Sequence, residues 1–159
     1  MTIRMRFVQG NEVSSDLIEW HESVAMPISP SHVETVTPAG KYLGQHASGG
    51  MQAREPGYDA GTFAKEFFLD IPTSSQFQAD TFYSYMEGSI GEPYDWKAML
   101  GFVLPGHFHT KFQALCSAKV AIGLRKCLIF RWPLAVPDHL IDPRDLLLVL
   151  SAILEIPHY

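Results

Sequence analysis

The sequence has few of the features that mark disulfide-rich, membrane-spanning or nucleic-acid-binding proteins. It contains only two cysteines in 159 residues, Cys116 and Cys127, which excludes the disulfide framework of a small secreted domain. Its longest apolar run, Leu146 to Leu150, is far too short to cross a membrane. Acidic residues outnumber basic ones by 17 to 12, so the chain lacks the basic excess that phosphate binding requires. We therefore expect no membrane span and no nucleic-acid partner.

A signal peptide, an internal repeat and a long linker are also missing from the pattern. The segment MTIRMRFVQG has no apolar stretch of about 7 to 15 residues, which favours a cytoplasmic location. With 47% hydrophobic and 18% charged residues, the composition argues against disorder. A chain of this length can bury one core, so we expect a single domain over residues 1–159. Nothing in the sequence specifies an oligomeric state.

The order of predicted elements is typical of an α+β fold. Ile3, Met5 and Phe7 alternate with Arg4 and Arg6, which predicts a strand with one buried face. Further strands are predicted on both sides of the turn at 38–40, at 49–54, at 65–71 and at 127–132. Helices are predicted near 16–25, over 75–88 with Ser75 as its cap, from near Cys116 to Gly123 or shortly after it, and from the cap Asp142 to about Ile153. The helix over 75–88 is expected to have one apolar face, because Phe77, Phe82, Tyr85 and Met86 recur near helical spacing. We expect an antiparallel sheet packed against a few helices.

The predicted hairpin brings two histidines together. If the chain turns about Ala39, His32 faces His46 and Glu34 faces Gly44, with all four residues on the same side of the sheet. A loop longer by one residue would move His46 to the other side. Facing histidines occur as metal ligands, as a catalytic base with its orienting partner, and as polar residues on an exposed face, and the register alone leaves these alternatives open.

Cys116 is the second residue of interest because the sequence after it favours a helix and the sequence before it does not. A cysteine in the first turn of a helix is exposed to unpaired N–H groups, which stabilise a thiolate. A nearby histidine that accepts its proton would make the thiol a nucleophile. The alternative is a buried core cysteine, and Cys127, inside the apolar run CLIF, fits that interpretation better.

Several motifs, taken in order, resemble one known family. They are SHVE at 31–34, YLGQHASGGMQAR at 42–54, GEPYDW at 91–96, CS at 116–117 and DPRDLLLVLSA at 142–152. This pattern resembles the circularly permuted branch of the NlpC-type papain-like cysteine hydrolases, the YiiX-like group, including its short phage and prophage members. The resemblance spans nearly the whole chain and implies a permuted papain-like fold, in which the histidine strand precedes the cysteine helix.

The resemblance also implies roles for individual residues. Cys116 would be the nucleophile, His32 the general base and His46 the polar third member that orients His32. Tyr94 matches a tyrosine close to the nucleophile, where its hydroxyl could help to bind an oxyanion. Glu34 competes with His46 for the orienting role, because carboxylates orient imidazoles in other triads. Asp95 and Trp96 are interpreted as structural.

The function that follows is hydrolysis of a small peptide, amide or acyl ester through an acyl-enzyme. The alternative is a non-catalytic papain-like accessory or binding protein of phage or prophage type, because a fold does not fix a function. No cofactor is expected. We also predict no metal in the functional protein, because His107 and His109 lack a recognised ligand spacing. Cys116, His32 and His46 could in principle form a Cys-His-His set, so adventitious zinc is expected to inhibit.

Overall fold

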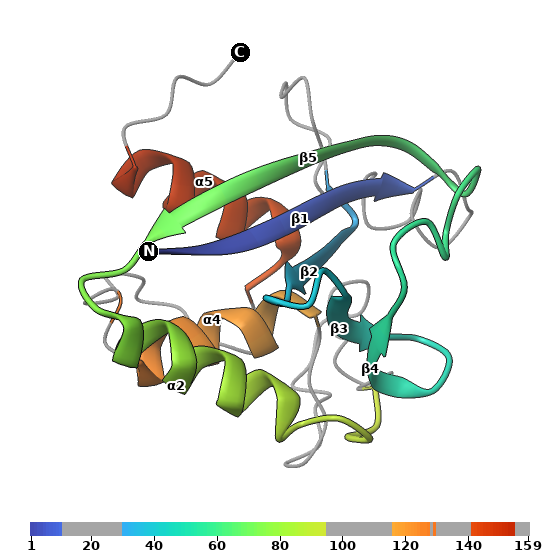
Figure 1. Cartoon of the computed structure of the whole chain (residues 1–159). Coiled ribbons are helices and arrows are strands. Elements are labelled where there is room, and N and C mark those ends of the chain that lie inside the picture. The colour runs from blue at the N-terminus through green and yellow to red at the C-terminus, as the bar shows by residue number, and fades with distance from the viewer. Residues whose placement is uncertain (11–29, 95–115, 128, 130–140, 155–159) are drawn as a thin grey trace, which may run out of the picture.

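A five-stranded sheet and three helices make up the part of the chain that the structure describes. The computed structural model describes residues 1–10, 30–94, 116–127, 129 and 141–154 (Figure 1). The strands are β1 (Thr2–Gly10), β2 (His32–Val36), β3 (Tyr42–His46), β4 (Gly50–Arg54) and β5 (Phe63–Pro72), and the helices are α2 (Gln76–Glu87), α4 (Cys116–Lys126) and α5 (Pro143–Ile153). This arrangement confirms the predicted α+β class.

The sheet is antiparallel throughout, in the order β4-β3-β2-β1-β5. Val36 pairs with Tyr42 and Thr35 with Leu43, which is the register predicted for the hairpin. The turn between them is short: the Gly40 N–H donates to the Thr37 carbonyl at 2.8 Å, and Gly40 adopts a φ of 81° that favours glycine. This turn places His32 and His46 on the same side of the sheet.

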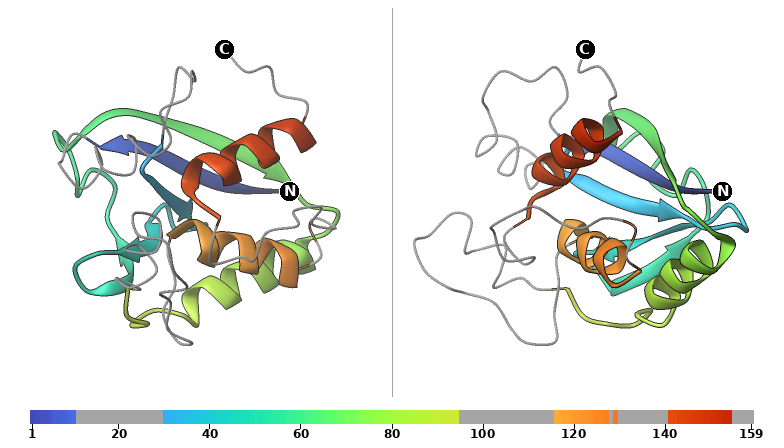
Figure 2. Two further views of the ribbon diagram at one scale, coloured as in Figure 1. Left: turned by 180° about the vertical axis from the view of Figure 1, so that it is seen from behind. Right: turned by 90° about the vertical axis from the view of Figure 1, so that its left-hand side faces the viewer.

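Alternation along the strands separates an apolar face from a polar one. Ile3, Met5 and Phe7 of β1 are fully buried in the core, together with Val33 of β2 and Leu43 of β3. The helices supply the other half of this core. Figure 2 shows α4 lying between α2 and α5, and α4 also contacts β2 and β3. The first residue of α4 is therefore carried to the strands that hold the histidines.

The helix ends follow the predicted capping residues, with one error in the predicted apolar face. Ser75 caps α2 by accepting from the Gln78 N–H, and Asp142 caps α5 by accepting from the Asp145 N–H at 2.6 Å. Phe77, predicted to lie on the buried face of α2, is 78% exposed. The buried positions are Ala79, Phe82 and Met86, which repeat at intervals of three and four, whereas Phe77 falls outside that stripe.

Some predictions concern residues outside the described ranges. These are the helix near 16–25, the strand over most of 127–132, and the interpretations of Asp95, Trp96, His107 and His109. The helix that begins at Cys116 continues past Gly123 to Lys126. Of the helices in the described ranges, none has the length and apolar character needed to cross a membrane.

Candidate active site

The two predicted histidines face each other at the open end of the β2–β3 hairpin. The ring centroids of His32 and His46 are 5.1 Å apart, with the planes tilted by 44°. The side chain of His46 is only 9% exposed and that of His32 is 22% exposed. The register prediction is therefore confirmed. The two rings do not bond to each other directly, because a carboxylate lies beside both of them.

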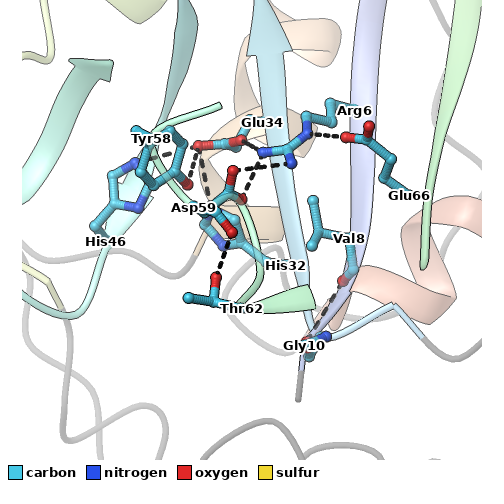
Figure 3. Close-up of polar contacts among 11 residues, drawn as sticks. Arg6, Val8, Gly10, His32, Glu34, His46, Tyr58, Asp59, Thr62 and Glu66 are labelled. Atoms are coloured by element: carbon cyan, nitrogen blue, oxygen red, sulfur yellow. Dashed lines mark hydrogen bonds and ion pairs between the residues drawn. The ribbon is translucent and has the colours of Figure 1, made fainter. Parts of the chain in front are cut away.

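Glu34 is the centre of this site. Its Oε1 lies 3.3 Å from Nε2 of His46 and 3.6 Å from Nε2 of His32. The carboxylate is fully buried, and Gly44 opposite it leaves the space that it occupies. A Cβ at Gly44 would stand 2.8 Å from Cγ of Glu34. The absence of a side chain at position 44 thus allows a carboxylate between the two histidines (Figure 3).

Arg6 holds the other side of the carboxylate and corrects the sequence interpretation of β1. Its position in the alternation predicted an exposed face, but Arg6 is 1% exposed. Nη1 donates to Oε2 of Glu34 at 2.7 Å, and Nε donates to Glu66 at 2.7 Å. The guanidinium also forms a forked pair with Asp59, at 2.8 and 3.1 Å. One arginine therefore bridges three carboxylates below the site.

The loop between β4 and β5 covers this polar face. Asp59 pairs with Arg6 as described, and the Tyr58 hydroxyl donates to Oε1 of Glu34 at 2.8 Å. The ring of Tyr58 also stands edge-on to His46, with centroids 5.4 Å apart. Because this loop buries the polar face, the Arg6–Glu34 pair is shielded from water. Burial and the charge of Glu34 raise the pKa of Tyr58, so its hydroxyl stays protonated and can donate.

Cys116 meets the site from the helical layer. It is the first residue of α4 and is 5% exposed, and its thiol is hydrogen-bonded to the side chain of His32. Because Nε2 of His32 faces Glu34, Nδ1 is the ring nitrogen left for the sulfur. His32 therefore lies between a thiol and a carboxylate. That arrangement can accept a proton from sulfur on one side and stabilise the resulting imidazolium on the other.

The pKa values of these groups move in the directions that an ion pair requires. Burial opposes the charged form of each group, but the mutual attraction between Cys116 and His32 outweighs it. The pKa of His32 is raised, with help from Glu34, and the pKa of Cys116 is lowered, with help from the backbone of Val33. Burial of Glu34 is likewise outweighed by the two histidines and Arg6, which hold its pKa well below the usual range.

His46 and Cys127 behave differently from His32 and Cys116. Burial lowers the pKa of His46, so this imidazole stays neutral at neutral pH although it also contacts Glu34. Burial raises the pKa of Cys127, which keeps the second cysteine a thiol. The surroundings thus shift the pKa values of the two histidines in opposite directions, and those of the two cysteines likewise.

Tyr94 lies on a segment that docks against β3 and β4. The Gln45 side chain donates to the carbonyls of Glu92 and Pro93, at 3.2 and 2.7 Å, and the Met51 N–H donates to the Glu92 carbonyl at 2.8 Å. A Cβ at Gly50 would stand only 2.1 Å from this carbonyl oxygen, which explains the glycine there. Tyr94 is half-buried and follows directly after this docking point.

A cavity of about 310 Å³ opens beside the histidines. Its described lining includes His32, His46, Tyr58, Asp59 and Arg54, but not Cys116. The cavity therefore reaches the carboxylate side of His32. Polar groups of both charges and the apolar surface of Phe63 and Val8 contribute to its wall, which suits a small molecule with polar and apolar parts.

Sequence reasoning missed three residues of the site: Arg6, Tyr58 and Asp59. Arg6 sits in an ordinary alternating strand, and its carboxylate partners are 28, 53 and 60 positions away along the chain. Tyr58 and Asp59 lie in a loop whose sequence, EPGYDAGT, reads as turns. No local pattern marks them. The one available signal in the sequence was Gly44, which the predicted hairpin register places opposite Glu34.

Comparisons with known proteins identify the fold. A scan against protein-family models finds no match, and a search of curated proteins finds no similar sequence. Among solved structures, the chain shares its fold with a crystal structure described as the metalloprotein YiiX from Escherichia coli O157:H7. The two have a TM-score of 0.56 and 17% sequence identity, over 82% of this chain and 68% of that chain. The α+β core is therefore a YiiX-like fold.

Proposed function

We propose that this protein is a cysteine hydrolase that cleaves an amide or ester acyl bond. The observation that supports it is the hydrogen bond between His32 and Cys116, at the first residue of a helix, with the pKa of the thiol lowered and that of the imidazole raised. Thiolate and imidazolium together form the active pair of thiol hydrolases. Glu34 behind the imidazole completes the arrangement of nucleophile, base and orienting group.

The reaction has two halves. In the first, the Cys116 thiolate forms a bond to the carbonyl carbon, and the His32 imidazolium gives its proton to the departing nitrogen or oxygen as the acyl bond breaks. The product is a thioester on Cys116. In the second half, His32 takes a proton from water, the resulting hydroxide adds to the thioester carbon, and the acid leaves as the C–S bond breaks. The thiolate–imidazolium pair is then restored.

Glu34 takes the orienting role in this proposal, and His46 supports Glu34. Oε1 of Glu34 faces Nε2 of both His32 and His46, whereas His46 is linked to His32 only through this carboxylate. The resemblance assigned His46 to this role directly, with Glu34 as the competitor. Tyr94 and the backbone N–H of Cys116 are proposed to bind the oxyanion. Because Gln45 of β3 donates to the Pro93 carbonyl, a shift of this histidine strand would also move Tyr94.

The fold proposed for this enzyme is a circularly permuted papain-like one. The chain order supports it, because the histidine strand β2 precedes the cysteine helix α4. The likeness to YiiX supports the fold alone. That structure is described as a metalloprotein, which raises the question of a metal for this site as well. The substrate class we propose is a small peptide, amide or acyl ester, which is the class that the resemblance implies.

Alkylation of the two cysteines tests the proposal within one molecule. Cys116 and Cys127 are each 5% exposed, so neither cysteine reacts merely because it lies on the surface. We expect Cys116 to react faster at neutral pH, with a midpoint below the value of about 8.5 for a free thiol. Replacing His32 by Gln should move that midpoint back towards the free value. Mass mapping of the adducts over a pH series measures both.

Turnover is tested with a panel of activated acyl esters and peptide amides, using Cys116→Ala as the control. Loss of hydrolysis in that variant supports the proposal. Equal alkylation rates for the two cysteines, with the same pH profile for Cys116 in the wild type and in His32→Gln, would contradict it. That outcome would favour the alternative of a binding protein whose ligand occupies the cavity beside His46 and Tyr58.

A further inference from the structure

The atoms around Glu34 have an unusual feature: two buried imidazole nitrogens point at one carboxylate oxygen without a hydrogen bond. Nε2 of His32 and Nε2 of His46 are both inaccessible to solvent, and among the described residues neither has a hydrogen-bond partner. Both lie near Oε1 of Glu34, and the three atoms are all within 4.8 Å of one another. Buried polar atoms are normally paired, so two in one place indicate a missing partner.

The spacing of these atoms suits a tetrahedral metal. Zinc binds imidazole nitrogen and carboxylate oxygen at about 2.0–2.2 Å, which puts neighbouring tetrahedral ligands about 3.3–3.5 Å apart. The observed separations from Oε1 of Glu34 are 3.3 Å to His46 and 3.6 Å to His32. These two separations differ from the tetrahedral spacing by no more than a few tenths of an ångström, and the two nitrogens lie within 4.8 Å of each other. Two imidazoles and one carboxylate are also a ligand set that zinc uses in catalytic sites.

The surrounding charges favour a dication. The carboxylates of Glu34, Asp59 and Glu66 carry two more negative charges than Arg6 balances, and a metal on Nε2 of His32 would take the place of the imidazolium proton there. Outer hydrogen bonds already orient the carboxylate ligand, because Arg6 binds its Oε2 and Tyr58 binds its Oε1. Both histidines also line the cavity of about 310 Å³, so the site lies at the wall of that cavity.

We propose that a divalent transition metal such as zinc binds between His32, Glu34 and His46, and that its binding reversibly blocks the thiol chemistry. The second half of this inference rests on the proposed function. The imidazolium of His32 needs a proton on each ring nitrogen, and a metal on Nε2 takes one of those positions. His32 then cannot supply the leaving group with a proton as readily. Cys116 faces the other ring nitrogen and is not a ligand in this site.

Zinc binding is measured by competition with a chromophoric chelator on protein first stripped with a chelator. We expect one zinc per chain for the wild type and for Cys116→Ser, and a loss of affinity of more than about tenfold for His46→Gln and Glu34→Gln. Glu55→Gln is the matched control, because Glu55 is an exposed carboxylate paired with Lys41 away from the site. Circular dichroism of each variant verifies that it is folded. Should Glu34→Gln fail to fold, His46→Gln carries the test.

Two results would overturn the site. One is no stoichiometric zinc binding by the wild type. The other is binding that survives in His46→Gln and is lost in Cys116→Ser, which would place the metal on the thiol.

The regulatory role is tested separately, by alkylation and turnover with and without zinc. We expect zinc to slow turnover, a chelator to restore it, and His46→Gln to lose this sensitivity. If Cys116 is unreactive even in metal-free protein, the hydrolase proposal fails while zinc binding still supports the metal site. If the thiol is activated but zinc does not bind, the metal site fails and the hydrolase stands.

Discussion

At the scale of single residues, Arg6 sets the charge balance beneath the site. It bridges three carboxylates and lies over the rings of Tyr42 and Phe63, with its Cζ 4.5 and 5.1 Å from their centroids. Removing one partner of a buried ion pair leaves the charge of the other partner buried without compensation. The position of Glu34 thus depends on a side chain from a neighbouring strand.

Replacing Arg6 by Met should lower the free energy of unfolding by about 3–5 kcal/mol, because Glu34 would stay buried without its cation. Arg6→Lys should lose less, since it keeps the charge but not the forked geometry. Arg4→Met is the matched control: Arg4 lies on the same strand and pairs with Asp70 at the surface, where such a pair contributes about 1 kcal/mol or less. Urea unfolding measures all three. Similar losses at positions 4 and 6 would contradict the buried role of Arg6.

At the scale of secondary-structure elements, two glycines make close contacts for different purposes. Gly44 in β3 leaves room for Glu34, and Gly123 in α4 lets the helix approach Phe82 and Tyr85 of α2. An added Cβ would stand 2.8 Å from Glu34 in the first case and 2.9 Å from Phe82 in the second. One contact belongs to the site and the other to helix packing, so they can be separated by mutation.

Gly44→Ala should displace Glu34 and destabilise the fold by about 1–3 kcal/mol, as overpacking does. It should also move the pH midpoint of Cys116 alkylation upwards, because His32 loses its orienting carboxylate. Gly123→Ala should change stability through helix packing and leave that midpoint unaltered, since it lies two turns along α4 from Cys116. Iodoacetamide rates over a pH series compare the two variants. An equal shift in both would mean that Glu34 does not act on the thiol.

Element boundaries were largely predictable because local signals set them. Ser75 and Asp142 cap their helices, and the short turn at 38–40 determines the hairpin register. Phe77 shows where this reasoning fails. An aromatic residue near a helix start was counted into the apolar face, although the spacing of Ala79, Phe82 and Met86 turns it outward.

At the scale of the whole molecule, the buried carboxylate couples stability to pH. Its contacts with the two histidines and Arg6 outweigh burial and lower the pKa of Glu34 in the folded state. An unfolded glutamate titrates near about 4.3. A lowered folded pKa stabilises the protein above the unfolded value, and that contribution is lost as the pH falls towards the folded value.

The difference in unfolding free energy between the wild type and Glu34→Gln should therefore be largest above about pH 5 and shrink in more acid solution. At neutral pH we expect about 1–3 kcal/mol, because Arg6 loses one charged partner and keeps Asp59 and Glu66. Asp70→Asn is the control, because Asp70 is half-exposed beside Arg4 and its loss should have little effect. Urea titrations from neutral to acid pH measure the difference. A constant difference over that range would show that Glu34 is not the coupled group.

The sequence by itself determined the α+β class, the five strands of the described sheet, the hairpin register that pairs His32 with His46, and the helix that begins at Cys116. These depend on periodicity, turns and caps, which act between residues close together in the chain. Only the tertiary structure decided that Arg6 is buried, that Tyr58 and Asp59 fold over it, and that Glu34 lies between the histidines. These depend on charges meeting across distant segments, where no local pattern records the partner.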